Sequence, residues 1–251
     1  MTMSDARRAL NDRAILEIWD RGDGQTPAER ALTILSAAGD GRERDAEKLT
    51  AGARDAELVR LYAQTFGERV TALARCTNCG ELLDLSFDLS TLQAGCGDTQ
   101  REWRVSSRSA PAYDIRFRLP SSTDLAHASR AASAAEARAD LLERCVISAE
   151  REGAPVQPRD LPEDVVAVLG QAMAEHDPQS DLLLGTTCPA CRAEQDVTFD
   201  IVQFMWSEIA ARARQVLVNV HSLALAYGWS EADILALPRA RRAVYLGLLE
   251  E

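Results

Sequence analysis

The chain has 251 residues, a hydrophobic fraction of 46% and a formal net charge of −11 at pH 7, so it can form one large or two small domains and is too apolar to be disordered. The acidic balance argues against a nonspecific nucleic-acid binder and against attraction to an anionic membrane. The sequence has no apolar run that approaches the length of a membrane span and no apolar stretch after the N-terminal arginines. We therefore expect a cytoplasmic protein with reduced cysteines and no signal peptide.

The N-terminal region, residues 1–68, is predicted to be helical. Apolar residues recur at helical spacing over residues 9–19, and residues 26–29, TPAE, form a capping box with proline at the first helical position. The charged, glycine-rich residues 39–47 predict a loop, and a further helix is expected over residues 54–66.

A short unit that contains a C-x-x-C pair occurs twice in the chain. Residues 76–89, CTNCGELLDLSFDL, match residues 188–201, CPACRAEQDVTFDI, at a constant offset. The repeated positions are Asp84 and Asp196, Phe87 and Phe199, Asp88 and Asp200, and Leu89 and Ile201. Apolar and polar residues alternate beside each pair, so each unit is predicted to be a strand, a tight turn and a strand. Residues 69–95 and 182–201 are the two halves of this predicted split ribbon.

The two turns supply four thiols, Cys76, Cys79, Cys188 and Cys191. Four thiolates are the ligand set of a closed structural zinc site, which has no open position for a substrate water. Thioredoxin-type redox chemistry is the alternative, but it needs such a pair at the start of a helix, and here both pairs are followed by strand patterns. We expect one structural Zn²⁺ per chain, and much of its binding free energy would be folding free energy.

Residues 96–181 are predicted to be an insertion between the two halves of the ribbon. Alternating patterns predict strands over 103–106 and 113–119, where a proline ends the second. The alanine-rich residues 125–149 are expected to be helical, in one or two pieces, and residues 163–175 form one more predicted helix.

The C-terminal region, residues 202–251, begins with a predicted long helix over residues 202–227. Its apolar residues follow steps of three and four, as in a coiled coil: Trp206, Ile209, Ala213, Val216, Val220, Leu223 and Tyr227. This seam packs either in the core of the protein or against a partner. Two short helices are expected after Gly228. The fold class is therefore α+β: a helix-rich protein organised around a split four-cysteine zinc ribbon, with a mixed insertion and C-terminal helices.

Few other residues suggest chemistry. Cys145 lies on an apolar helix face and is expected in the core, whereas Cys96 is a loop thiol without an assigned role. His127, His176 and His221 are scattered, and no nucleophile elbow, phosphate loop or dinucleotide motif is present. We therefore expect no catalytic residues and no enzymatic activity.

The last predicted helix carries three arginines, Arg239, Arg241 and Arg242. They form a solvated face, or they face an acidic patch on a partner, or they face DNA. The acidic balance and the lack of a broader basic stripe argue against DNA. The candidate partner-binding residues are Trp206, Tyr227, Trp229, Arg239, Arg241 and Arg242.

Four segments together resemble a known family. They are FGERVTALARCTNCGELLDLSFDL, RFRLPSSTDLA, LLLGTTCPACRAEQDVTFDIVQFMWSEI and VHSLALAYGWSEADILALPRARRAVYLGLL. The family is the baseplate family of contractile-tailed phages and contractile injection systems, described as a T-even-phage-type baseplate hub or hub-assembly chaperone family. The resemblance spans roughly residues 25–250, and GWSEADILALPRARRAVYL is its most specific stretch.

The resemblance implies a baseplate component or baseplate assembly chaperone that binds other baseplate or tail proteins. The lack of a catalytic motif and the acidic balance predict that this protein is non-enzymatic, with no nucleic acid and no membrane as partners. The resemblance leaves the choice between component and chaperone open, as well as the oligomeric state. The rival interpretation from the residues themselves is a zinc-ribbon nucleic-acid-binding regulatory protein.

Overall fold

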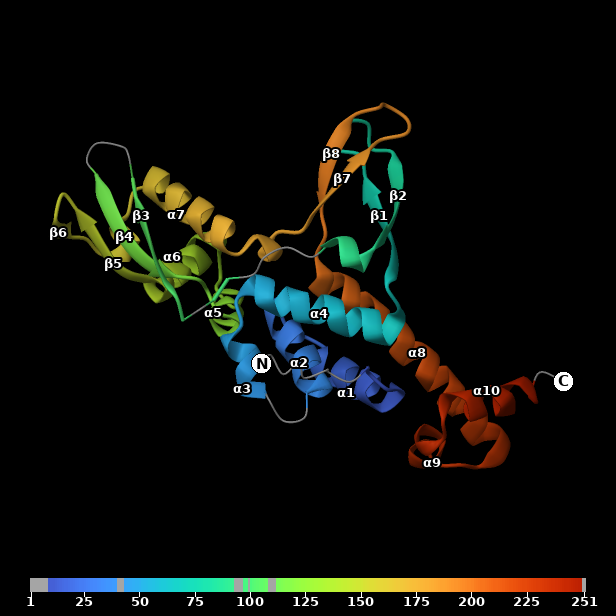
Figure 1. The fold of residues 1–251 in the computed structure, drawn as a ribbon. Helices are drawn as coiled ribbons and strands as arrows, with labels where there is room; N and C mark the ends of the chain where they lie inside the picture. Colours follow the sequence, from blue (N-terminus) through green and yellow to red (C-terminus); the bar gives the residue numbers. More distant parts are fainter. Residues whose placement is uncertain (1–8, 40–42, 93–96, 99, 108–111, 250–251) are drawn as a thin grey trace, which may run out of the picture.

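The computed structural model describes residues 9–39, 43–92, 97–98, 100–107 and 112–249, and it shows a helical body from which a pair of hairpins and a mixed sheet-and-helix part extend (Figure 1). The body contains α1 (Asp12–Gly22), α2 (Pro27–Ala38), α3 (Glu43–Lys48), α4 (Ala51–Phe66) and the long α8 (Ile201–Tyr227). The loop predicted over residues 39–47 is wrong from Glu43 onward, because these residues form α3. The predicted capping box is present, since Thr26 accepts a hydrogen bond from the Glu29 amide and the Glu29 carboxylate accepts one from the Thr26 amide.

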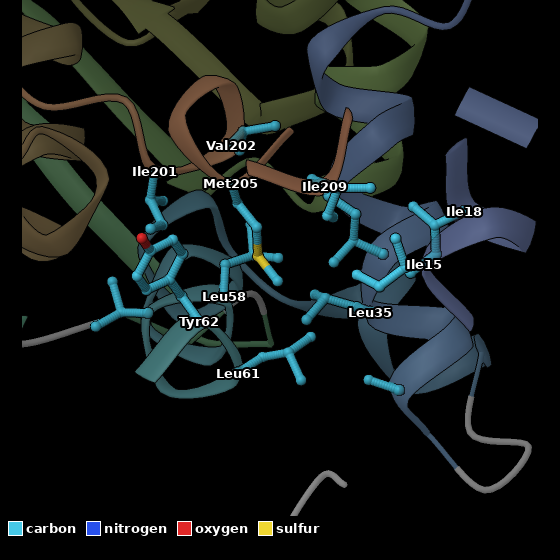
Figure 2. Close-up of a cluster of buried hydrophobic side chains, with 14 of the residues drawn as sticks. Ile15, Ile18, Leu35, Leu58, Leu61, Tyr62, Ile201, Val202, Met205 and Ile209 are labelled. Atoms are coloured by element: carbon cyan, nitrogen blue, oxygen red, sulfur yellow. The ribbon is translucent and has the colours of Figure 1, made fainter. Parts of the chain in front are cut away.

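One apolar core joins helices from both ends of the chain. Ile15 and Ile18 of α1, Leu58 of α4, and Met205 and Ile209 of α8 are all fully or nearly fully buried in it (Figure 2). The helices of residues 1–68 are therefore packed directly on the first helix of the C-terminal region. Burial of this apolar surface is the main favourable contribution to the stability of the body.

Helix α8 begins and ends at clear signals. The Asp200 side chain accepts a hydrogen bond from the Gln203 amide, and Gly228 adopts a left-handed conformation with φ of 69° that ends the helix. Five residues in the middle of the predicted seam are buried: Ile209, Ala213, Val216, Val220 and Leu223. They belong to the core that α8 shares with the other helices of the chain, so for these residues the core interpretation of the seam is confirmed.

Two short helices follow α8, namely α9 (Glu231–Ala236) and α10 (Arg239–Gly247). Ser230 caps α9 by accepting a hydrogen bond from the Asp233 amide. Ile234 is fully buried and attaches α9 to the core of the body. The two helices thus pack back against the C-terminal half of α8 (Figure 1).

The insertion forms a four-stranded antiparallel sheet covered by helices. The strands β3 (Glu102–Ser106), β4 (Tyr113–Arg118), β5 (Val146–Arg151) and β6 (Ala154–Pro155) follow this order in the sheet. The helices are α5 (Ser122–Ala128), α6 (Ala134–Cys145) and α7 (Glu163–His176), with short 3₁₀ turns at Pro158–Asp160 and Pro178–Ser180. Val165 and Leu169 of α7 pack on Ile115 and Phe117 of β4 in a second core.

The structure corrects one predicted element of the insertion. The alanine-rich residues 125–149 do form two helices, but the second helix ends at Cys145 and strand β5 begins at Val146. Val146 pairs with Phe117, and Ala149 pairs with Ile115 in the sheet. Tertiary burial against the second core therefore overrides the local helical pattern at residues 146–149.

The insertion is attached to the body through a buried carboxylate. Asp177 is 3% exposed and accepts hydrogen bonds from the Thr50 hydroxyl at 3.1 Å and from the amides of Gly52 and Gly97, both at 2.8 Å. Gln179 is also buried and donates to the Leu92 carbonyl at 2.9 Å. The exit of the insertion is thus bonded to its entry and to the first turn of α4.

None of the helices in the described part of the chain is long and apolar enough to cross a lipid bilayer.

Candidate metal centre

The four cysteines lie in the turns of two antiparallel hairpins that stand side by side away from the body (Figure 1). The first hairpin is β1 (Arg69–Arg75) with β2 (Leu82–Asp88), and the second is β7 (Leu183–Thr187) with β8 (Glu194–Thr198). A 3₁₀ turn, η1 (Leu89–Leu92), follows the first hairpin, and α8 follows the second. The predicted split ribbon is therefore present as two separate two-stranded sheets.

The two cysteine turns have the same local structure. The Cys76 amide donates to the Glu81 carbonyl at 2.8 Å, and the Cys188 amide donates to the Ala193 carbonyl at 2.9 Å. The residue after the second cysteine has a positive φ in both turns, 75° at Gly80 and 62° at Arg192. Glycine adopts that conformation without strain, whereas arginine does so at some cost. The sequence repeat is thus a repeat of backbone geometry.

The sulfur atoms converge at one point between the hairpins. Cys76 Sγ lies 3.6 Å from Cys191 Sγ, and Cys79 Sγ lies 3.7 Å from Cys188 Sγ, so each close pair joins the two hairpins. All four sulfur atoms lie within 4.8 Å of one another. A tetrahedral zinc–thiolate centre with Zn–S bonds of about 2.3 Å needs sulfur atoms about 3.8 Å apart, whereas a disulfide needs about 2.05 Å. The cluster fits a four-coordinate metal site.

Hydrogen bonds to the sulfur atoms shift the pKa values of Cys191 and Cys79 in opposite directions. The Asn78 side chain and the Ala193 amide bond to Cys191 and lower the pKa of its thiol to about 6. The Glu81 amide has the same effect on Cys79, but the neighbouring thiols outweigh it and raise the pKa of the Cys79 thiol to about 12. Metal ligation requires the thiolate form of cysteine, so a bound cation would favour ionisation of all four ligands.

A polar contact and an aromatic contact support the site from outside the sulfur cluster. Gln195 Oε1 of the second hairpin accepts hydrogen bonds from the Thr77 amide at 2.9 Å and from the Thr77 hydroxyl at 3.2 Å. The repeated phenylalanines Phe87 and Phe199 pack edge to face, with ring centroids 5.2 Å apart. The Gln195–Thr77 contact fixes the two turns relative to each other, as outer-shell groups do in metal sites, and the Phe87–Phe199 contact joins the hairpins where they meet the core of the body.

The other thiols and the histidines lie away from this centre. Cys145 is 1% exposed, and burial raises the pKa of its thiol to about 12, so it is an unreactive core residue as predicted. His176 stacks on Trp103 with ring centroids 3.6 Å apart. Within the described residues the four-cysteine group is the one cluster whose geometry would hold a metal ion. Cys96 lies outside the described residues.

The structure separates the candidate partner-binding residues into four groups, of which Arg242 is the last. Trp206 is engaged within the body, where the Arg30 guanidinium lies 4.3 Å from its ring centre. Tyr227 and Trp229 stack on each other at 4.8 Å and both meet Tyr245. Arg239 and Arg241 are exposed on α10, as a surface role requires.

Arg242 differs from the surface role expected for it. Arg242 is 6% exposed, and its guanidinium pairs with Asp12 of α1. Asp12 also pairs with Arg212 of α8 at 2.7 Å. The sequence gives no local signal for this ion pair, because Asp12 and Arg242 are 230 positions apart. Asp177 and Gln195 were missed for the same reason, since their partners are also distant in the sequence.

A comparison with protein-family models gives a match over most of the chain. Residues 22–206, more than half of the chain, match the family model described as T4 bacteriophage base plate protein. The match includes α2, the insertion, both cysteine turns and the start of α8. No curated protein and no solved structure matches the chain. The chain belongs to the T4 bacteriophage base plate protein family.

Proposed function

We propose that the protein is a non-enzymatic component or assembly chaperone of the baseplate hub of a contractile phage tail or phage-tail-like injection system. It acts by binding other tail proteins. The observation that carries this proposal is the family match over residues 22–206, because it includes both halves of the metal site and the insertion between them. A baseplate is built by protein–protein contacts, and a scaffold with a closed metal site suits that task.

The metal in this proposal is one Zn²⁺ per chain, bound by Cys76, Cys79, Cys188 and Cys191. Thiolate ligands in a tetrahedral arrangement favour zinc over magnesium, calcium or manganese. With four protein ligands, no coordination position remains for substrate, so the role is structural. The ion would join the first hairpin, which follows α4, to the second hairpin, which leads directly into α8.

The partner surface in this proposal is the C-terminal region, residues 202–250. Seven of its large apolar residues in the described part of the chain are exposed: Leu217, Val218, Leu225, Tyr227, Val244, Leu248 and Leu249. Leu225 on α8 is 80% exposed, the highest value among the exposed large apolar residues. Val218 and Leu225 are seven residues apart and so lie on one face of α8, and exposed apolar residues that share a face are typical of a surface that a partner covers. Tyr227 and Trp229 belong to the same region, where their rings stack, and aromatic residues often dominate binding energies.

The experiment is affinity purification of the tagged full-length protein from its native host during particle assembly. Baseplate or tail proteins should co-purify in stoichiometric amounts. Val218→Asp and Leu225→Asp, which alter exposed residues of α8, should reduce the yield of these proteins at least tenfold. Ile147→Asp is the matched control, because Ile147 is similarly exposed but lies on β5 of the insertion.

Two results would contradict the proposal. Recovery of DNA with no tail protein would support the nucleic-acid-binding alternative. Equal recovery of tail proteins with the α8 variants and with the Ile147 control would place the partner surface elsewhere.

A further inference from the structure

A groove of about 820 Å³ runs between α1 and the pair α9–α10. Its apolar lining includes Leu10 and Leu16 on one side and Leu235, Leu237 and Pro238 on the other. Its floor holds Asp12 and Arg242. Helices α9 and α10 lie at the opposite end of α8 from the two cysteine hairpins (Figure 1), and none of the four cysteines lines the groove.

The charges at the floor of the groove do not balance. The Asp12 carboxylate is bound by two guanidinium groups, those of Arg212 and Arg242. The Arg242 side chain is only 7% exposed, and its Nε has no hydrogen-bond partner among the described residues. A buried donor without an acceptor and an extra buried positive charge are both costly, so such a site favours a second anionic group. Arg242 is the residue of this cluster that lines the groove.

The rest of the lining restricts which anion fits. Arg239 lies one helical turn before Arg242, lines the same groove and is exposed at its rim. Glu17, Asp20 and Glu231 also line the groove, and so does Arg13, which pairs with Glu17 at 3.1 Å. A ligand with many negative charges, such as a nucleic-acid backbone, would be repelled by these carboxylates. A protein segment with apolar side chains and a single carboxylate satisfies both the apolar walls and the two arginines.

We propose that this groove binds an apolar segment of a partner baseplate protein and that one Asp or Glu carboxylate of the segment bonds to Arg242 and Arg239. The inference rests on the proposed function and adds a second contact to it, because the exposed α8 residues Val218 and Leu225 do not line the groove. It also separates the three arginines of the last helix, since Arg241 is exposed but does not line the groove.

The test compares three variants of the full chain: Arg242→Gln, Arg239→Gln and Arg241→Gln. Arg242→Gln leaves the Asp12–Arg212 pair intact, so the fold should survive, and thermal unfolding checks this. Arg239→Gln changes an exposed residue and provides a second variant if the first unfolds. The first two variants should weaken binding of the co-purified tail protein at least tenfold, and Arg241→Gln should bind as the unmodified chain does.

A photo-crosslinking residue in place of Ala236, which lines the groove, identifies the segment that enters it. The crosslinked peptide should contain an Asp or Glu. Replacing that residue by Asn or Gln in the partner should weaken binding as much as Arg242→Gln does. Two results would overturn the groove proposal and leave the baseplate function standing. One is a crosslinked segment without a carboxylate. The other is a tail-protein affinity that is the same for the Arg242, Arg239 and Arg241 variants. If the unmodified chain binds no tail protein, both proposals are wrong.

Discussion

At the scale of single residues, Asp12 connects three helices, because its carboxylate on α1 pairs with Arg212 of α8 and with Arg242 of α10. Burial raises the pKa of Asp12, but hydrogen bonds and charge interactions with Arg212 and Arg242 outweigh burial and lower the pKa below its usual value of 3.8. A carboxyl group with a lowered folded-state pKa stabilises the fold at pH values above its unfolded-state pKa, and this stabilisation is lost as the pH falls through the folded-state pKa.

Asp12→Asn should lower the free energy of unfolding at pH 7 by about 3 kcal/mol, because it leaves two largely buried guanidinium groups without a carboxylate. The difference from the unmodified protein should narrow below about pH 4, where the carboxyl group begins to take up a proton. Chemical denaturation at several pH values measures both effects, with the metal content determined at each pH.

Asp114→Asn is the control for this prediction. Asp114 pairs with Arg104 at 2.6 Å, but the Arg104 side chain is 68% exposed, and exposed ion pairs contribute about 1 kcal/mol or less. An Asp12 variant as stable as the Asp114 variant would show that the three-helix ion pair does not hold the C-terminal helices on α1.

At the scale of elements, two glycines test how the insertion is held on the body. A Cβ atom at Gly52, in the first turn of α4, would lie 2.3 Å from Asp177 Oδ1, whereas a Cβ atom at Gly170 in α7 would have no neighbour within 4 Å. Gly52→Ala should therefore lower the free energy of unfolding by about 1 to 3 kcal/mol, despite the higher helix propensity of alanine. Gly170→Ala should raise it by about 0.5 to 1 kcal/mol.

Thermal unfolding of the two variants makes the comparison, since both replace a helical glycine with alanine. Stabilisation by both substitutions would mean that α4 and the exit of the insertion are not in close contact. Destabilisation by both would point to a cause other than Asp177.

The elements also show what the sequence predicts well and what it does not. The cysteine turns, the strands beside them and the ends of α8 were predictable, because turn residues, alternation and caps are local signals. Strand β5 was not, because the helical pattern of the alanine-rich segment continues past Cys145 and only burial on β4 makes Val146 extended. The buried position of Arg242 also depends on a contact with the distant Asp12. Sequence periodicity cannot reveal such a pairing.

At the scale of the whole molecule, the metal site holds together in space two segments that are far apart in the sequence. Cys79 and Cys188 are 109 positions apart, and their sulfur atoms lie 3.7 Å from each other. Cys188→Ser should separate the two hairpins and lower the melting temperature by on the order of 10 °C or more, because binding of a structural zinc ion contributes many kcal/mol to folding.

Cys145→Ala is the control for the loss of a thiol, because Cys145 is buried in the insertion away from the sulfur cluster. This variant should lose a small amount of stability and keep its metal. Equal metal content in the Cys188 and Cys145 variants would show that Cys188 is not a ligand.

The most direct measurement is the metal content of the full-length protein purified without added zinc. Elemental analysis should find close to one zinc per chain, and native thiol titration should leave Cys76, Cys79, Cys188 and Cys191 protected until a chelator or acid removes the metal. A zinc content near zero, together with four freely titrating thiols in the folded protein, would contradict the account.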